Sequence, residues 1–181
     1  LVADSNASPY TRFVNCSFYN NRATNGNGGA VRVASGTARL SNCLFTGNSA
    51  NFDGGGLHVR GAGNTPRVYV YNSTFAGNTA GGYGGGIAIQ LSSEVYVYNS
   101  IAWYNTDNVY PTGDPREQIS LGGNATVQYT CIQGWNATHF PGPGNLGADP
   151  QFVDADGPNN HFGGLDDNCR LLPTSPLIDR G

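Results

Sequence analysis

The sequence repeats a nine-residue unit, Asn-x-x-Phe-x-x-Asn-x-Ala, which begins at Asn15, Asn42 and Asn72 and, in a weaker form, at Asn99. These starts are 27, 30 and 27 residues apart. Each of the first three copies is followed by a glycine cluster and then by apolar residues at alternate positions. A unit this short cannot bury a hydrophobic face alone, whereas stacked copies line a continuous core. The repeat therefore predicts a solenoid.

A second alternating segment leads into each following copy, at residues 38–40, 68–71 and 95–98. A period of two residues is typical of strands, and the copies run in one chain direction, so we expect parallel stacking. A degraded fifth copy is found when Tyr129 is aligned with Asn99, 30 residues earlier. We predict an all-β parallel solenoid of about five coils over residues 1–134. Residues 135–181, which are rich in Gly, Pro and Asp, form a capping segment packed on it within one domain.

Parallel stacking places equivalent residues of successive coils above one another. Two such columns are apolar and are predicted to lie in the core: Phe18, Phe45, Phe75 and Ala102 in the first, and Val31, Leu57 and Ile87 in the second. Two other columns consist of asparagines: Asn15, Asn42, Asn72 and Asn99 in one, and Asn21, Asn48, Asn78 and Asn105 in the other. Because a side-chain amide both donates and accepts hydrogen bonds, we expect both asparagine columns to form structural ladders at the bends.

The composition excludes several function classes. Only 9 Lys and Arg residues are scattered among 12 Asp and Glu, for a net charge of −3, so a nucleic-acid partner is not expected. No run approaches the roughly 20 apolar residues of a membrane-spanning helix. The chain contains no Met and begins with Leu1 in what resembles the middle of a coil. We therefore expect a processed form or a fragment whose first coil exposes a strand edge.

Candidate catalytic residues are few and dispersed. The acidic residues of the regular coils, Asp53, Glu94 and Asp107, fall at different phases of the repeat. The three histidines, His58, His139 and His161, are also scattered. Glycan-cleaving enzymes use convergent carboxylates, so we expect no catalytic residue and no enzyme activity.

Acidic residues are concentrated in the tail. Asp154 and Asp156 precede Gly157 with the spacing that a hard cation favours, and Asp166 and Asp167 would complete its shell. Two interpretations remain open, a structural Ca²⁺ site and ordinary Asx turns. No other cofactor is predicted.

Outward-facing aromatic residues suggest a binding face. Tyr69 should stack under Tyr96 and Tyr71 under Tyr98, with Trp103 farther along the chain. Such residues either pair across rungs as ordinary strand residues or form a surface for sugar or protein.

The chain contains four cysteines and several glycosylation sequons. Cys131 with Cys169 is the favoured disulfide. Cys16 and Cys43 share a repeat position, so they form either a bridge strained by the strand spacing or two free, stacked thiols. Asn6, Asn124 and Asn136 are candidate glycosylation sites, whereas the sequons at Asn15 and Asn72 lie in the predicted ladder.

The repeat resembles the right-handed parallel β-helix repeats of bacterial exported proteins, including the polymorphic outer-membrane-protein type. The segments Gly147-Ala-Asp-Pro-Gln-Phe-Val-Asp154 and Arg170-Leu-Leu-Pro-Thr-Ser-Pro-Leu-Ile-Asp-Arg-Gly181 resemble the closing region of the choice-of-anchor Q family. These resemblances imply a right-handed coil and attachment at the cell surface. They supply no catalytic residues.

Together these observations predict an exported or cell-surface structural or adhesive protein that stacks end to end into extracellular filaments. The alternative is a β-helix that binds or degrades carbohydrate. Expected partners are therefore other copies of the chain or an extracellular polysaccharide.

Overall fold

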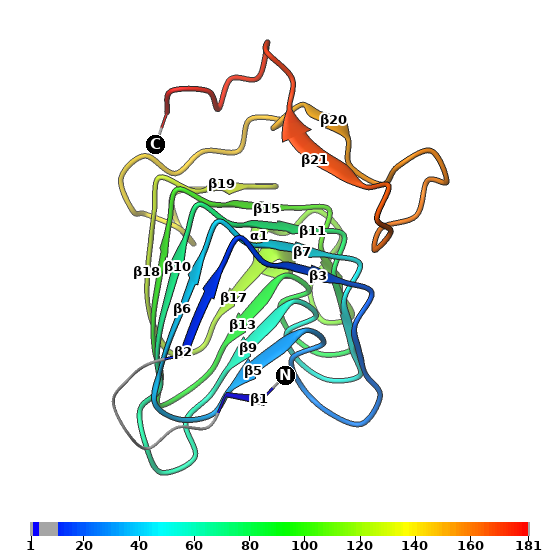
Figure 1. Ribbon diagram of the computed structural model, residues 1–181. Coiled ribbons are helices and arrows are strands. Elements are labelled where there is room, and N and C mark those ends of the chain that lie inside the picture. The colour runs from blue at the N-terminus through cyan, green and yellow to red at the C-terminus, as the bar shows by residue number, and fades with distance from the viewer. Residues whose placement is uncertain (1, 4–10, 181) are drawn as a thin grey trace.

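A computed structural model describes residues 2–3 and 11–180. The chain winds into a coil whose strands form four parallel sheets (Figure 1). Sheet A contains β1 (Val2–Ala3), β5 (Val31–Val33), β9 (Leu57–Val59), β13 (Ile87–Ile89) and β17 (Ile119–Leu121). Sheet B contains β2 (Thr11–Val14), β6 (Thr37–Ser41), β10 (Arg67–Tyr71), β14 (Glu94–Tyr98) and β18 (Asn124–Gln128).

The other two sheets complete each coil. Sheet C contains β3 (Ser17–Tyr19), β7 (Leu44–Thr46), β11 (Thr74–Ala76), β15 (Ile101–Trp103) and β19 (Cys131–Ile132). Sheet D contains β4 (Arg22–Ala23), β8 (Ser49–Ala50), β12 (Thr79–Ala80) and β16 (Thr106–Asp107). Four complete coils are thus flanked by a partial coil at each end. The predicted all-β parallel solenoid is confirmed.

Both predicted apolar columns lie in the core. Phe45 stacks on Phe18 and on Phe75 with ring centroids 4.5 and 4.4 Å apart. Val31, Leu57 and Ile87 pair in register across sheet A. Their side chains, like those of Phe45 and Phe75, are fully buried. Stacking identical rings fills the interior without voids, because each rung repeats the shape of the rung beneath it.

One asparagine column is a continuous ladder that is exposed at Asn21 and buried from Asn48 onward. The Nδ2 atoms of Asn21, Asn48 and Asn78 each donate to the Oδ1 atom of the next asparagine at 2.8 Å. The last member, Asn105, donates in the same way to Oε1 of Gln118. Gln118 belongs to the one-turn helix α1 (Pro115–Gln118), which is inserted between β16 and β17. This glutamine closes the ladder 13 residues after Asn105, outside the frame of the repeat.

The other asparagine column has a different physical role. Asn15, Asn42, Asn72 and Asn99 have φ angles of 53, 54, 48 and 48°, in the left-handed region that asparagine tolerates. Among the described residues, one side-chain hydrogen bond links this column, from Asn42 Nδ2 to Asn15 Oδ1 at 3.2 Å. The expectation of a second full ladder is therefore corrected. Tyr129 replaces asparagine in the fifth copy at φ 51°, because the position requires the backbone conformation rather than the amide.

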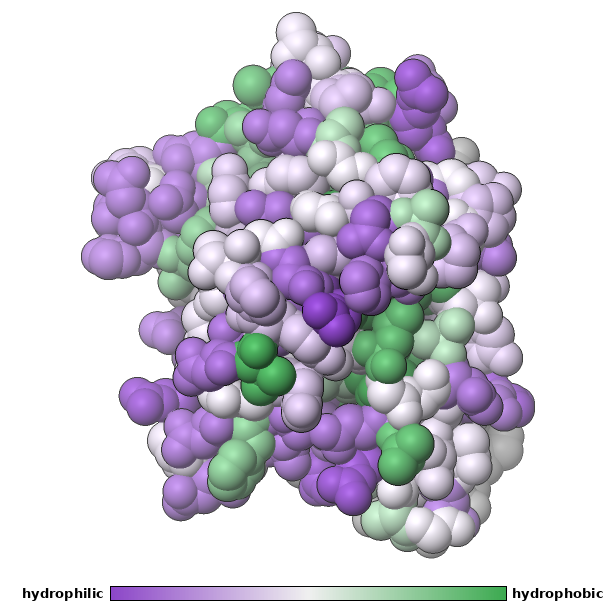
Figure 2. Space-filling model, turned by 180° about the vertical axis from the view of Figure 1, so that it is seen from behind, coloured by the Kyte–Doolittle hydropathy of each residue, from purple (hydrophilic) through white to green (hydrophobic). Residues whose placement is uncertain are grey.

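The segment after the coils has two parts. Residues 136–148 lie over the last rung, where Phe140 is 1% exposed and packs on the core. There Ile132 N–H donates to the Leu146 carbonyl at 2.9 Å and Tyr129 N–H donates to the Pro143 carbonyl at 2.9 Å. This part satisfies strand groups that would otherwise have no partner at the end of the coil. The view from behind Figure 1 shows a mostly polar surface with separate apolar patches (Figure 2).

The second part, residues 149–180, runs along the outer side of sheet C rather than over the end. It contains the antiparallel pair β20 (Phe152–Asp154) and β21 (Asn168–Leu171), which Figure 1 shows above sheet C. The Thr46 hydroxyl donates to Asp167. The Phe162 ring lies against Gly77, where an added Cβ would overlap it. Glycine at position 77 is thus required both for this contact and for its φ of 62°.

Candidate functional site

The outer face of sheet A lies between two rows of loop residues, and we call the space between these rows the groove. Its floor is a column of side chains in register across four strands, namely Arg32, His58, Ala88 and Ser120. One side is formed by the loops that join sheet D to sheet A, which swing outward before each strand of sheet A (Figure 1). Asp53, Tyr83 and Tyr110 lie on these loops. Arg60, Gln90 and Leu91 follow the ends of β9 and β13 and form the opposite side.

A hydrogen-bonded network crosses the groove above its floor. Gln90 Nε2 donates to Asp53 Oδ2 at 2.6 Å, and Gln90 Oε1 lies 3.2 Å from His58 Nε2. The other oxygen of Asp53 accepts from the backbone N–H of Tyr83 at 2.8 Å. His58 lies beneath this bridge and is fully buried although it points away from the core. The bridge therefore joins the two sides of the groove over a buried histidine.

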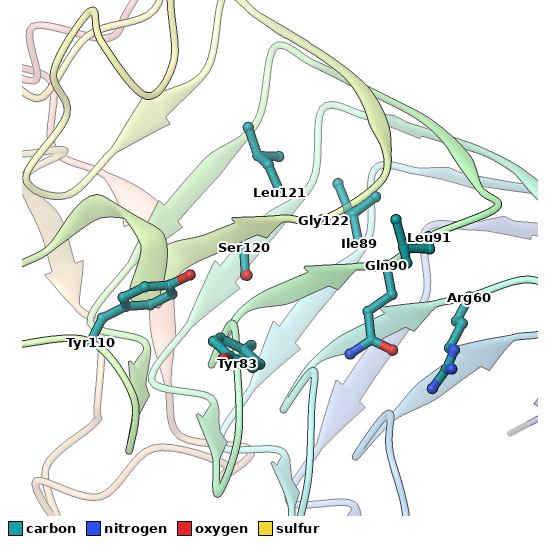
Figure 3. Close-up of a pocket in the computed structure, with 9 residues that line it drawn as sticks. All are labelled: Arg60, Tyr83, Ile89, Gln90, Leu91, Tyr110, Ser120, Leu121 and Gly122. Carbon is teal, nitrogen blue, oxygen red and sulfur yellow. The ribbon is translucent and has the colours of Figure 1, made fainter.

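Beside the bridge the groove opens into a cavity of about 390 Å³ (Figure 3). Figure 3 shows Tyr83 and Tyr110 on one side, Gln90, Leu91 and Arg60 on the other, and Ser120 between them. Tyr83 is 44% exposed, and its ring centroid lies 5.7 Å from that of Tyr110 at an angle of 56°. Because the two rings are tilted, they leave aromatic surface open to the cavity. The cavity thus combines aromatic surface with a guanidinium, an amide and a hydroxyl.

Some of the charged side chains around the groove form ion pairs and others do not. The described residues contain two ion pairs, Arg67 with Glu94 and Arg116 with Asp114, and neither includes Arg32 or Arg60. Arg116 also lies over the Tyr110 ring, 4.1 Å from its centroid. Hydrogen bonding from Arg116 lowers the pKa of Asp114 to about 2. Burial lowers the pKa of His58, which favours the neutral imidazole at pH 7.

The predicted tyrosine face lies on sheet B, away from this groove. Tyr69 stacks on Tyr96 at 5.0 Å and Tyr71 stacks on Tyr98 at 5.6 Å, with interplanar angles of 11 and 14°. The guanidinium of Arg39 covers the Tyr71 ring at 4.7 Å. Rings stacked along the coil cover one another's faces, so this surface presents mainly ring edges and hydroxyl groups. It is therefore a weaker stacking platform for sugars than the cavity beside Tyr83.

Trp103 does not belong to the tyrosine face. It lies on sheet C, where it is 8% exposed and contacts Tyr104 edge to face. The sequence places it near the tyrosines in the repeat, but the turn between the sheets carries it to another side of the coil.

The tail carboxylates have other partners. Asp166 accepts from Asn159 at 2.9 Å, and Asp167 accepts from the Gly163 N–H at 2.7 Å in addition to the Thr46 hydroxyl. Asp154 and Asp156 lie beside Asp149 and Phe152 around a separate hollow under the tail. Within residues 2–3 and 11–180, no group of three or more His, Cys, Asp or Glu side chains is arranged to hold a metal ion.

All four cysteines are free thiols, so the favoured Cys131–Cys169 disulfide is not formed, and Cys16 and Cys43 are the unbridged pair that the strand spacing favours. The Cys131 thiol in the last coil donates to the Ala148 carbonyl at 3.1 Å. Cys169 lies in β21, beside a hollow that also borders Cys43. This hollow lies two to three coils away from Cys131. The backward course of the tail along sheet C separates the favoured pair.

These thiols are expected to resist alkylation. Burial raises the pKa of both Cys131 and Cys169 to about 12. At pH 8 each carries about a thousandfold less thiolate than an unfolded cysteine. Iodoacetamide labelling followed by mass spectrometry should thus modify both sites far more slowly in native than in denatured protein. Equal rates in the two states would contradict this burial.

The glycosylation candidates lie in different settings. Asn124 is exposed at the start of β18, whereas Asn136 is half-buried and accepts from the His139 N–H at 3.0 Å. Asn6 lies outside the described residues.

The groove residues were not predicted as a site. The sequence identifies Asp53 and His58 only as dispersed residues and gives no reason to consider Gln90, yet one chain of hydrogen bonds joins all three. The repeat contained part of the signal, since aligning the copies places Asp53 under Tyr83 and Arg60 under Gln90. The path of the loops, which decides whether the two sides meet, has no such regularity.

The search of protein families found a match to the right-handed β-helix region over residues 2–140. The curated proteins and the solved structures gave no significant match. No helix among the described residues is long and apolar enough to span a membrane.

Proposed function

We propose that this chain, a member of the family of right-handed β-helix proteins, is an exported or cell-surface adhesive module that binds a polysaccharide in the groove of sheet A. The observation that carries this proposal is the cavity beside Tyr83. An exposed tyrosine ring, a guanidinium outside the ion pairs of the described residues and an amide line one hollow there. Sugars are recognised by this combination of an aromatic face with a few fixed polar groups.

The proposal is one of binding without cleavage. The carboxylates near the groove are already engaged: Asp53 with Gln90 and Tyr83, Asp107 with the N–H groups of Gly84, Val109 and Tyr110, and Glu117 with the Gly113 N–H. A general acid or base must reach the glycosidic oxygen or a water beside it. These carboxylates instead maintain the loops that shape the groove.

The resemblance of the tail to surface-anchored proteins supports an extracellular location. The covered last rung of the coil favours adhesion through the groove over end-to-end stacking of copies. Head-to-tail assembly would have to displace residues 140–146, which pair with the last rung. The same chain can thus act as a rigid surface element while its side carries the ligand.

A panel of neutral and acidic polysaccharides tests the proposal by affinity electrophoresis. Tyr83→Ala and Arg60→Ala should each weaken binding about tenfold, because each removes roughly 1.4 kcal/mol of contact. Tyr98→Ala, which changes the face of sheet B instead, should leave binding unchanged. Release of reducing ends should not occur. Failure of the wild-type protein to bind any polysaccharide, or loss of binding only in the Tyr98 variant, would refute the groove assignment.

A further inference from the structure

Two buried polar atoms lie unpartnered on the floor of the groove. Among the described residues, Arg32 Nε and His58 Nδ1 are the buried side-chain nitrogen or oxygen atoms that have no hydrogen-bond partner. They belong to paired positions on β5 and β9, and neighbouring rungs lie about 4.8 Å apart. Buried polar groups in proteins are almost always hydrogen-bonded. Two unpartnered atoms on adjacent rungs therefore indicate a shared binding position.

The protonation of His58 follows from the groups around it. The Asp53 carboxylate can only accept hydrogen bonds, so the Gln90 amide must direct its Nε2 group toward Asp53. The Gln90 Oε1 atom then faces His58, and His58 Nε2 must carry the ring proton in order to donate to it. In the neutral imidazole this leaves Nδ1 as an acceptor. Asp53 thus sets the tautomer of His58 through Gln90.

The complementary ligand group must accept a hydrogen bond on one side and donate one on the other. Arg32 Nε–H is only a donor, and the neutral His58 Nδ1 is only an acceptor. A hydroxyl group satisfies both atoms, whereas a carboxylate has no proton to give to His58. One oxygen with two hydrogen bonds of about 2.9 Å at a tetrahedral angle joins atoms about 4.7 Å apart, and the backbones that carry the two side chains are separated by a similar rung spacing of about 4.8 Å.

We infer that Arg32 and His58 form a binding position for a hydroxyl group of a neutral sugar on the floor of the groove. This inference rests on the proposed function, since it specifies which ligand chemistry the groove selects. The side chains of Arg32 and Gln90 are half-buried. Gln90 lines the cavity beside Tyr83 and contacts His58, so a chain of neutral sugars in that cavity would have to extend past Gln90 to place a hydroxyl here.

The predicted pH dependence distinguishes a hydroxyl from an anion. Charged groups that face His58 come from three elements: Arg32 on β5, Asp53 on the loop before β9, and Arg60 after β9. Gln90 on the β13 side is uncharged. Protonation of Nδ1 removes the acceptor, so binding of a neutral sugar should weaken as the pH falls through the pKa of His58, which burial holds below its usual value. Binding of a carboxylate would strengthen over the same interval.

The experiment uses the full chain with two probes, a neutral glucan hexaose and a hexagalacturonate, measured by titration calorimetry at pH 8 and at pH 5. We expect the neutral probe to bind better at pH 8. Arg32→Lys, which keeps the charge but moves the donor, should weaken its binding about tenfold. Arg39→Lys on sheet B is the matched control and should have no effect. Thermal unfolding at both pH values verifies that each variant is folded.

Several results would overturn the inference while leaving the proposed function intact. In the first, the acidic probe binds better than the neutral probe at pH 5. In the second, Arg32→Lys leaves binding of the neutral probe unchanged whereas Tyr83→Ala abolishes it. The second result would mean that only water occupies the position between Arg32 and His58. The ¹⁵N spectrum of the His58 ring gives a readout that needs no ligand, because a proton on Nδ1 rather than Nε2 would also refute the assignment. Absence of binding to any sugar would instead refute the proposed function.

Discussion

Replacing Asn78 with leucine is expected to lower the free energy of unfolding by about 3–5 kcal/mol, because the change leaves several buried polar groups without partners. Asn78 Oδ1 accepts from the backbone N–H of Asn48 at 3.0 Å and from Asn48 Nδ2 at 2.8 Å. Its Nδ2 group donates to the Phe45 carbonyl at 3.0 Å and to Asn105 Oδ1. Leucine has the same branched shape but a larger volume, so it leaves no cavity, and the loss reflects missing hydrogen bonds together with overpacking.

The matched substitutions Asn78→Gly and Asn72→Gly separate the two asparagine columns. Asn78→Gly removes the same ladder bonds and should be strongly destabilising. Asn72→Gly should change stability by less than about 1 kcal/mol, because glycine adopts the φ of 48° without strain. Urea unfolding followed by circular dichroism measures both. Equal losses at the two positions would show that both columns depend on their amides.

Replacing Phe75 with alanine is expected to destabilise the protein by about 3–5 kcal/mol, because it opens a cavity inside a rigid stack. Phe75 is fully buried and lies 4.4 Å from the Phe45 ring. The rungs above and below are held at a fixed spacing by strand hydrogen bonds, so they cannot close into the space. The next member of the column, Ala102, is already small and offers no side chain to fill it.

Phe52→Ala is the control for this cavity. Phe52 is 56% exposed on the loop before β9, so its truncation should cost less than about 1 kcal/mol. Both variants are compared by the midpoint of urea unfolding. A small effect at Phe75 would mean that the coil relaxes around missing core volume.

The sequence determined the coil, its core and its register. In a parallel stack, contacting residues lie one repeat apart, so the offsets of 27 and 30 residues directly give pairs such as Phe45 with Phe75 and Asn48 with Asn78. The pattern could not separate an amide ladder from a column of left-handed residues, because asparagine suits both. The backbone angles at Asn72 and Tyr129 made that distinction.

The tertiary structure alone decided the groove and the course of the tail. Asp53, His58 and Gln90 meet because the loop before β9 folds over sheet A, and no repeat offset relates a loop to the floor opposite it. Gln118 completes the Asn ladder from an inserted helical turn for the same reason. The tail turns back along sheet C, where Phe162 fits against Gly77, and so keeps Cys169 away from Cys131. Repetition fixes contacts between equivalent residues, whereas contacts between unlike segments depend on packing that one repeat does not encode.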